Sequence, residues 1–165
     1  EGRWEKIVKS IIKYYDLPKK PKILDVGCGK GYFLYDFFKL VPDAEIYGID
    51  ISNYAIKNAK EEIRDRLKVG NATDIPWPDN YFDLVVSINS LHCLHCYDLD
   101  KALHEINRVG KNNKYICVES YRNEEEKANL LYWQVTCEMF NTPKEWLWFF
   151  SKADYNGDYS FIYFE

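Results

Sequence analysis

Three glycines at alternate positions give the first sign of chemistry in the chain. Within residues 22–37, Gly27, Gly29 and Gly31 lie between an apolar run and a helical pattern rich in aromatic residues. Glycine allows a sharp turn and lets a ligand approach the backbone closely. A turn that leads into a helix also offers free N–H groups to an anionic group. The stretch therefore predicts a nucleotide-type binding site, with a plain tight turn as the alternative.

A carboxylate follows this turn at a useful distance. Asp50 ends the second apolar strand, nineteen residues after Gly31, where it can accept two hydrogen bonds from a ribose diol. Dinucleotide-binding turns typically read G-x-G-x-x-G, but Tyr32 occupies the place of the third glycine here. The spacing thus argues against a dinucleotide. The alternative for Asp50 is an ordinary surface or helix-cap residue.

Histidines and cysteines cluster in the sequence HCLHC at 92–96, directly after a predicted strand. His92 is the candidate general base, a role worth roughly 10²–10⁴-fold in rate; the alternative is a histidine packed in the loop. His95 is a weaker candidate. His92, Cys93, His95 and Cys96 are all metal-ligand types, but structural zinc sites usually recruit from two separated segments. We therefore expect no metal.

Polar side chains also end the predicted fifth strand, which finishes at Glu119 and Ser120. Tyr121 is a candidate wall of a substrate pocket. Arg122 is suited to hold an anionic substrate group such as a phosphate or carboxylate, with a solvated arginine near a helix start as the alternative. Cys28, inside the glycine loop, is expected to be a small filler and not a nucleophile.

Alternating strands and helices must position these residues. Strands are predicted at 22–28, 44–51, 66–70, 82–89 and 114–120, with helices at 4–15, 32–41, 53–63 and 99–109. Strands alternating with helices at this spacing imply a parallel α/β sheet with right-handed crossovers. The binding residues then share the carboxyl edge of the sheet.

The last third of the chain has a different pattern. Capping boxes predict helices over 123–140 and from 142–145 onward, before a closing strand at 159–165. Twelve of the 28 aromatic residues lie between Tyr132 and Phe164. The first of these helices is interpreted either as a lid over substrate or as a dimer surface.

Composition limits the function classes. A chain of 165 residues suits one domain, and a net charge of −4 disfavours a broad nucleic-acid surface. No apolar run approaches a membrane span, and no signal-peptide pattern is seen. Five cysteines, an odd number, favour reduced thiols and a cytoplasmic protein. Because the first residue is not Met, further residues are expected upstream.

Four segments in order, over residues 22–121, resemble the motifs of class I S-adenosylmethionine-dependent methyltransferases. They are ILDVGCGKG, YGIDIS, VGNATDIPWPDNYFDLVVSINSLHCL and ALHEINRVGKNNKYICVES. The resemblance implies a Rossmann-like three-layer α/β sandwich with a mostly parallel sheet of six or seven strands. It also implies one domain over 1–165 with a helical insertion at about 123–150. Members usually end with two antiparallel strands, whereas only one closing strand is evident.

The resemblance also assigns cofactor-binding roles. The residues concerned are Asp25, Gly27, Cys28, Gly29, Gly31, Asp50, Ile51, Asn71, Ala72 and Asn89. Asp25 and the glycines would shape the pocket for the methionine end, Asp50 would hold the ribose, and Ile51 would lie against adenine. Asn71 stands where the family commonly has an acid, and its amide oxygen can still accept a hydrogen bond. Asn89 would face the methyl group.

The expected activity is methyl transfer from S-adenosylmethionine to a small-molecule acceptor, leaving S-adenosylhomocysteine. Oxygen is preferred over nitrogen or carbon because His92 would deprotonate a hydroxyl. The sequence INSL after the fourth strand lacks the N-P-P-Y pattern, which argues against methylation of DNA bases. The expected partners are a small molecule and a second copy of the chain. The alternatives are a non-catalytic S-adenosylmethionine-binding assembly domain and, against the glycine spacing, a nicotinamide-dependent oxidoreductase.

Overall fold

The computed structural model describes residues 2–165 and contains a six-stranded sheet in the order β3-β2-β1-β4-β5-β6. The strands are β1 (Lys22–Val26), β2 (Glu45–Asp50), β3 (Leu67–Val69), β4 (Phe82–Ile88), β5 (Gly110–Glu119) and β6 (Asp158–Ile162). All neighbouring strands pair in parallel, including β5 with β6. The predicted Rossmann-like sheet is confirmed, with six strands.

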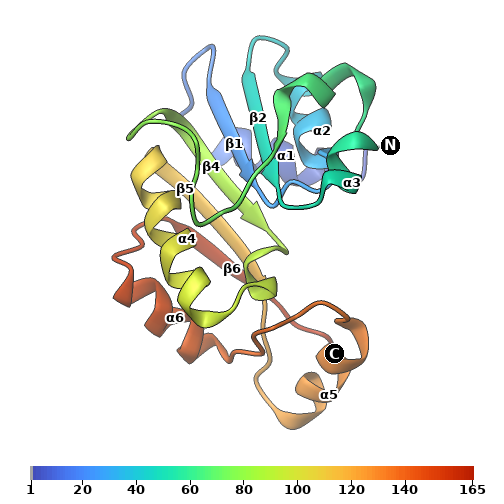
Figure 1. The fold of residues 1–165 in the computed structure, drawn as a ribbon, viewed down its shortest axis with the longest axis vertical. Helices are drawn as coiled ribbons and strands as arrows, with labels where there is room; N and C mark the ends of the chain where they lie inside the picture. Colours follow the sequence, from blue (N-terminus) through green and yellow to red (C-terminus); the bar gives the residue numbers. More distant parts are fainter. Residues whose placement is uncertain (1) are drawn as a thin grey trace.

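Helices connect successive strands and cover both faces of the sheet. They are α1 (Glu5–Tyr14), α2 (Tyr32–Leu40), α3 (Asn53–Lys57), α4 (Cys96–Val109), α5 (Glu124–Trp133) and α6 (Pro143–Lys152), with 3₁₀ turns η1 (Glu61–Arg66) and η2 (Leu91–Cys93). Figure 1 shows α4 in front of the sheet and the fainter α1 behind it. Within residues 2–165, every helix is too short or too polar to cross a membrane.

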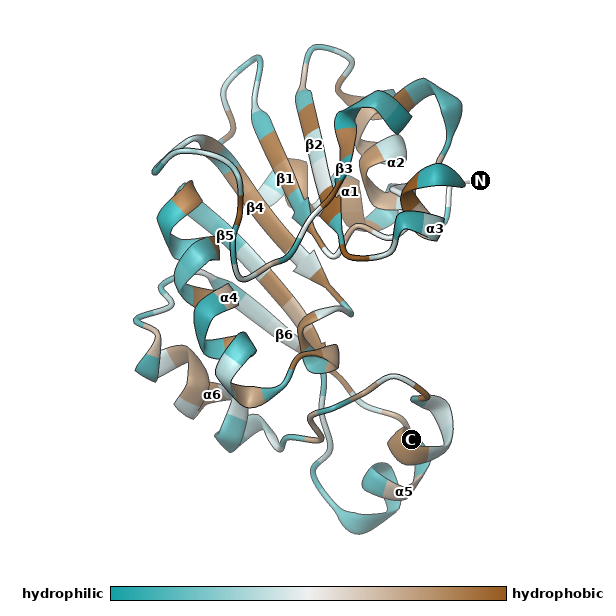
Figure 2. Cartoon of the chain, in the orientation of Figure 1, coloured by the Kyte–Doolittle hydropathy of each residue, from teal (hydrophilic) through white to brown (hydrophobic). Residues whose placement is uncertain are grey.

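Two apolar cores explain this layering. Successive side chains of a strand point to opposite faces, so Ile23 joins Phe37 and Val8 in one core. Leu24 joins Ile116 in the other core, on the side of α4 and α6. Because both faces are covered, the central strands are apolar along most of their length (Figure 2).

Two helices end differently from the prediction. The helix predicted over 53–63 is split into α3 and η1. The helix predicted over 123–140 ends at Trp133, because Gln134 is extended. Beyond it, the N–H groups of Glu138 and Met139 donate to the carbonyl of His92 at 3.0 and 3.1 Å. These tertiary hydrogen bonds replace further helix.

The two predicted helix starts in the last third are found. Thr142 and Glu145 form a reciprocal capping box with Pro in the first turn of α6. The side chain of Asn123 caps α5 by accepting from the Glu126 N–H at 2.9 Å. The carboxylate of Glu126 instead accepts from the N–H of Arg122 at 2.7 Å. The box at α5 is therefore shifted by one residue.

Candidate functional site

The glycine loop between β1 and α2 requires glycine for different reasons at different positions. Gly27, Gly29 and Gly31 have φ of 78°, 54° and 71°, which side chains rarely adopt. A Cβ on Gly27 would lie 1.8 Å from Oγ of Ser90, whereas one on Gly29 would meet no described atom within 4 Å. Gly27 thus allows close packing, and Gly29 leaves an open face for a ligand.

Asp50 is fixed beside this loop by backbone donors. The N–H of Gly29 donates to Oδ2 of Asp50 at 2.7 Å, and the N–H of Ser52 donates to Oδ1 at 2.8 Å. The N–H groups of Gly27 and Cys28 donate to the carbonyl of Ile49 at 2.8 and 3.0 Å. Each carboxylate oxygen of Asp50 keeps a further acceptor position, so it is oriented and still able to bind hydroxyl groups.

Asp25, at the end of β1, and Cys28, within the loop, are buried and have shifted pKa values. Asp25 is 4% exposed, and burial together with the charge of Asp50 raises its pKa to about 7. Burial is also the main cause that raises the pKa of the Cys28 thiol. Because a thiolate is the nucleophilic form, the neutral thiol of Cys28 agrees with its interpretation as a filler.

A cleft of about 160 Å³ lies at the carboxyl end of β2. Its lining is Gly27, Ile49, Asp50, Ile51, Gly70, Asn71, Ala72, Ser90, Cys93 and Leu94. Five residues assigned to the cofactor thus meet here. Ser90, Cys93 and Leu94 are not among the predicted cofactor residues, although their position after β4 places them at the same sheet edge. Oδ1 of Asn71 already accepts from the Thr73 N–H at 3.0 Å, which orients its amide.

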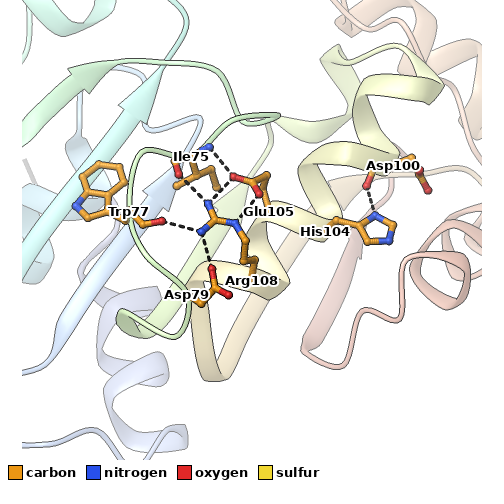
Figure 3. A network of polar contacts seen from close by, with 7 residues as sticks. All are labelled: Ile75, Trp77, Asp79, Asp100, His104, Glu105 and Arg108. Carbon is orange, nitrogen blue, oxygen red and sulfur yellow. Dashed lines mark hydrogen bonds and ion pairs between the residues drawn. The ribbon is translucent and has the colours of Figure 1, made fainter.

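An arginine on α4 fixes the loop that continues from Asn71 (Figure 3). The guanidinium of Arg108 donates to the carbonyls of Trp77 and Ile75 at 2.8 and 2.9 Å. It also contacts Glu105 at 2.6 Å and Asp79 at 2.9 Å. Such bidentate contacts constrain geometry as well as adding energy. Arg108 therefore holds the loop that carries the cleft wall against α4.

A larger cleft of about 530 Å³ lies beside the first turns of α2 and the carboxyl end of β4. Its lining is Gly2, Arg3, Trp4, Tyr32, Tyr35, Asp36, Lys60, Ile88 and Asn89. A smaller space of about 220 Å³ adjoins it, shares Trp4 and Asn89, and reaches Cys117. Asn89 has φ of 52°, an uncommon conformation for a residue other than glycine. The strand end that is expected to face the methyl group therefore has an unusual backbone.

Trp4, directly before α1, makes two kinds of contact. Its ring packs edge-on against Phe33 with centroids 6.1 Å apart, and its backbone N–H donates to Oδ2 of Asp36 at 3.1 Å. The same residue lines the larger cleft and the smaller space that adjoins it. Trp4 is thus packed against the core on one side and faces the site on the other.

His92 lies beneath the site. It is 2% exposed, lines none of the clefts above, and burial lowers its pKa to about 4. Its Nε2 lies 3.2 Å from Oε2 of Glu119, and its buried Nδ1 has no partner within residues 2–165. Gln134 donates to the other oxygen of Glu119. His92 is therefore neutral at pH 7 and built into a buried polar network.

The other predicted substrate residues lie at the start of α5. Arg122 forms an ion pair with Glu126 and one of 2.7 Å with Glu165, and it lies 4.1 Å from the centroid of the Tyr163 ring. The ammonium of Lys127 lies 5.2 Å from the ring of Tyr121. Neither residue lines the clefts around the glycine loop. Their substrate roles stay predictions.

The cysteines and histidines of HCLHC have separate partners. His95 lies 3.6 Å from Glu138, and Sγ of Cys93 lies 3.5 Å from Oγ1 of Thr136. Within residues 2–165, no three such side chains are grouped as metal ligands. This segment contributes Cys93 to the cleft at the carboxyl end of β2 and contacts the chain after α5.

Comparisons with known proteins agree with this geometry. A family model described as "Methyltransferase domain" matches residues 17–154. An uncharacterized methyltransferase of Schizosaccharomyces pombe is 34% identical over 65% of this chain and 41% of its own length. The demethylmenaquinone methyltransferase of Symbiobacterium thermophilum is 31% identical over 72% of this chain and 50% of its own. The chain thus spans about half the length of these curated relatives.

A solved structure also matches the fold. The YcgJ protein of Bacillus subtilis superposes with a TM-score of 0.71 at 21% identity, covering 88% of this chain and 66% of that one. Identity at this level supports the fold alone. The family assignment comes from the match over residues 17–154, which is most of the chain. Together with the glycine loop and Asp50, it shows that this chain belongs to the class I S-adenosylmethionine-dependent methyltransferase family, whose cofactor is S-adenosylmethionine.

Proposed function

We propose that the whole protein transfers a methyl group from S-adenosylmethionine to a small-molecule acceptor and releases S-adenosylhomocysteine. The observation that carries the proposal is a pair of clefts, one lined by Gly27 of the glycine loop and the other by Tyr32, the residue directly after that loop. One contains Asp50, Ile51 and Ala72, and the other contains Trp4 and Asn89. One cleft suits the adenosine and the other suits the methionine end and the acceptor.

The residues fit the cofactor as the family resemblance implies. Asp50 offers two oriented oxygens to the ribose hydroxyls, and Ile51 and Ala72 offer apolar surface to adenine. The open backbone at Gly29 suits the methionine end. Asn71 and Asn89 remain the proposed contacts to the adenine amino group and the methyl region.

Alignment of the acceptor is the main task of this chain's residues. When bound, the sulfonium supplies an activated methyl group, so the protein must hold a nucleophile in line with it. Such orientation contributes as much as about 7–11 kcal/mol in favourable systems. Trp4 and Asn89, which line both the larger cleft and its extension, are placed to position the acceptor and to exclude water.

The size of the larger cleft supports a small acceptor. Its volume of about 530 Å³ falls within the roughly 300–1,000 Å³ of small-molecule sites. The Symbiobacterium relative is named for a small-molecule acceptor, demethylmenaquinone. We therefore favour a small molecule over a polymer.

The preference for an oxygen acceptor rests on His92. A buried imidazole with a pKa of about 4 is a weak base, and it reaches no cleft described here. We therefore propose that His92 holds Glu119 and the loop after β4 in place, which removes the reason for preferring oxygen over nitrogen or carbon; a hydroxyl acceptor would lose its proton to water or to a base within the acceptor. A His92→Gln variant that keeps its turnover at pH 7.5 supports this view, and a loss of more than about 100-fold supports the base.

A cytoplasmic location is also proposed. All five cysteines, which lie within the described residues, are free thiols. Reduced thiols are typical of a reducing compartment. Mass spectrometry of the protein purified under alkylating conditions tests the proposal, because five modified cysteines are then expected.

Calorimetry and a transfer assay test the proposed activity. S-adenosylmethionine and S-adenosylhomocysteine are expected to bind, and NAD is not. Methyl-labelled S-adenosylmethionine is then incubated with panels of phenols, carboxylic acids and amines, and labelled product is expected with at least one panel. Absence of binding overturns the assignment. Binding without transfer to any panel favours the non-catalytic assembly domain.

A further inference from the structure

A cleft of about 510 Å³ lies outside the cofactor site, between α1 and the strands β5 and β6. Its walls include Ile7, Ile11, Tyr14, Tyr15, Tyr115 and Asp158. Most of this lining is apolar or aromatic, and Asp158 is the one carboxylate in it. An apolar cleft with few convergent polar groups is the usual form of a small-molecule site.

The fold builds this cleft from regular elements. Ile7, Ile11 and Tyr14 recur at helical spacing and therefore share one side of α1. Tyr115 and Asp158 are paired residues of neighbouring parallel strands, so their side chains point to the same face of the sheet. The side of α1 and this face of β5 and β6 form the two walls.

The carboxylate in the cleft is held by tyrosines. The hydroxyl of Tyr15 donates to Oδ2 of Asp158 at 2.8 Å, and that of Tyr14 donates to Oδ1 at 3.3 Å. Tyr15 is 8% exposed, so its hydroxyl is fixed within the protein. Asp158 is thus oriented, and it keeps acceptor positions for a ligand.

The charges around the cleft favour a cation. Lys6 is the one basic residue of the lining, and its exposed side chain can extend into solvent. The ammonium of the buried Lys114 on β5 is bound to the carbonyl of Lys111 at 2.8 Å. The groups left to contact a ligand are the aromatic faces and Asp158, and both attract positively charged groups.

We propose that the cleft between α1 and β5–β6 binds the alkylammonium group of a small organic ligand. Tyrosine rings around a carboxylate suit a cation with an apolar surface, such as a quaternary or alkylated amine. Anions are disfavoured by Asp158. The proposal does not depend on methyl transfer, although Ile7 and Tyr115 also line the smaller space next to Asn89.

A matched pair of probes tests the role of charge. Choline and its neutral isostere 3,3-dimethylbutan-1-ol have nearly the same shape. Each is titrated into the protein and followed by NMR shifts of the residues around Tyr14 and Asp158. Choline is expected to bind in the millimolar range, with the neutral isostere bound at least roughly tenfold more weakly. Equal binding of the two probes, or no binding of choline, overturns the proposal.

Variants locate the probe. Asp158→Asn is expected to weaken choline binding about tenfold, because a contact with a charged group is lost. Asp154→Asn, at an exposed acid outside the cleft, is the matched control and is expected to leave binding unchanged. Circular dichroism and S-adenosylhomocysteine affinity check that each variant folds.

A second pair of variants keeps the test decisive if Asp158→Asn fails to fold. Tyr14 is 71% exposed, so its replacement has little effect on folding. Tyr14→Ala is expected to weaken choline binding several-fold, while Tyr14→Phe, which keeps the ring, retains most of it. Choline affinity that is unchanged in Tyr14→Ala overturns the site.

Discussion

The glycine loop and the segment after α5 are both held by contacts between distant parts of the chain, but through different groups. In the loop, backbone N–H groups of Gly29 and Ser52 fix Asp50. In the segment from 134 to 139, Gln134 and two backbone N–H groups bind His92 and Glu119, on separate parts of the chain. The first set of contacts joins the ends of two neighbouring strands, at glycines that the sequence pattern identifies. The second set joins segments for which the sequence shows no corresponding pattern.

The surfaces of the two regions differ as well. Tyr132, Trp133 and Val135 are 90%, 72% and 95% exposed, whereas the glycine loop is packed against Ile63 and Leu67. Exposed aromatic groups gather where a partner or a ligand is bound. We therefore expect a rigid half that contains the glycine loop, up to residue 120, and an adaptable half from residue 121 onward, and this expectation is what the variants below examine. The predicted homodimer through the latter surface stays a prediction.

The largest effect is expected at Gly27. In Gly27→Ala, the new Cβ would lie 1.8 Å from Oγ of Ser90 at φ of 78°. Left-handed strain costs about 1–2 kcal/mol, and overpacking adds roughly 1–3 kcal/mol. We expect the free energy of unfolding, measured in urea, to fall by the sum of these two penalties. We also expect S-adenosylhomocysteine binding to be lost.

Gly29→Ala is the matched control for this change. It has similar strain, at φ of 54°, without a clash, so only about 1–2 kcal/mol of stability is expected to be lost. Equal losses of stability in the two variants would contradict the view that Gly27 is required for close packing.

The sequence predicted the rigid half better than the adaptable one. Each of the five predicted strands up to residue 120 was found, because apolar runs and turn residues are local signals. The predicted cofactor residues Asp50, Ile51 and Asn71 meet in one cleft because parallel strands share a carboxyl edge.

The burial of His92 and the end of α5 were not predictable in this way. The N–H of Glu138 bonds to a carbonyl 46 residues away, that of His92, and no periodicity encodes such a contact. The same holds for Arg122, whose partner Glu165 is 43 residues away. Tertiary hydrogen bonds, and not the local sequence pattern, determine the conformation of these segments.

The second effect is a change of stability with pH, through His92, whose carbonyl is bound by the adaptable half. The pKa of His92 is about 4 when folded and about 6.5 when unfolded, so the unfolded chain binds more protons between these values. Stability therefore falls as the pH drops from 6.5 toward 4, by as much as about 3 kcal/mol for this group. Urea unfolding between pH 4.5 and 7.5 measures the slope of the free energy of unfolding against pH.

Variants separate His92 from the other groups that titrate. Glu119, whose pKa is raised by burial, contributes a slope of opposite sign, so the difference between wild type and His92→Gln is the quantity to compare. His104→Gln, at an exposed histidine, is the control and is expected to keep the wild-type slope. An unchanged slope in His92→Gln would refute the buried neutral imidazole.

The third effect is on cofactor affinity. Asp50→Ala removes the acceptor of two backbone N–H groups and the proposed ribose contact. S-adenosylhomocysteine binding is expected to weaken by about 1–3 kcal/mol, the scale of hydrogen bonds to charged groups. Calorimetry measures this affinity. Asp50→Asn is the control, which keeps one acceptor oxygen and is expected to lose less affinity. Affinity that does not change in Asp50→Ala would show that the ribose lies elsewhere.

The smallest effect is expected at Arg122, in the adaptable half. Its guanidinium is about half exposed and pairs with the buried Glu126 and the exposed Glu165, and ion pairs that remain open to solvent contribute little to stability. Arg122→Gln is therefore expected to change the midpoint of urea unfolding little. Arg3→Gln, at a residue that lines the larger cleft, is the variant for comparison. If Arg122 holds an anionic acceptor, KM for that acceptor rises at least tenfold in Arg122→Gln while stability is retained. If the ion pairs are its whole role, KM stays at the wild-type value, because the guanidinium then makes no contact with the acceptor.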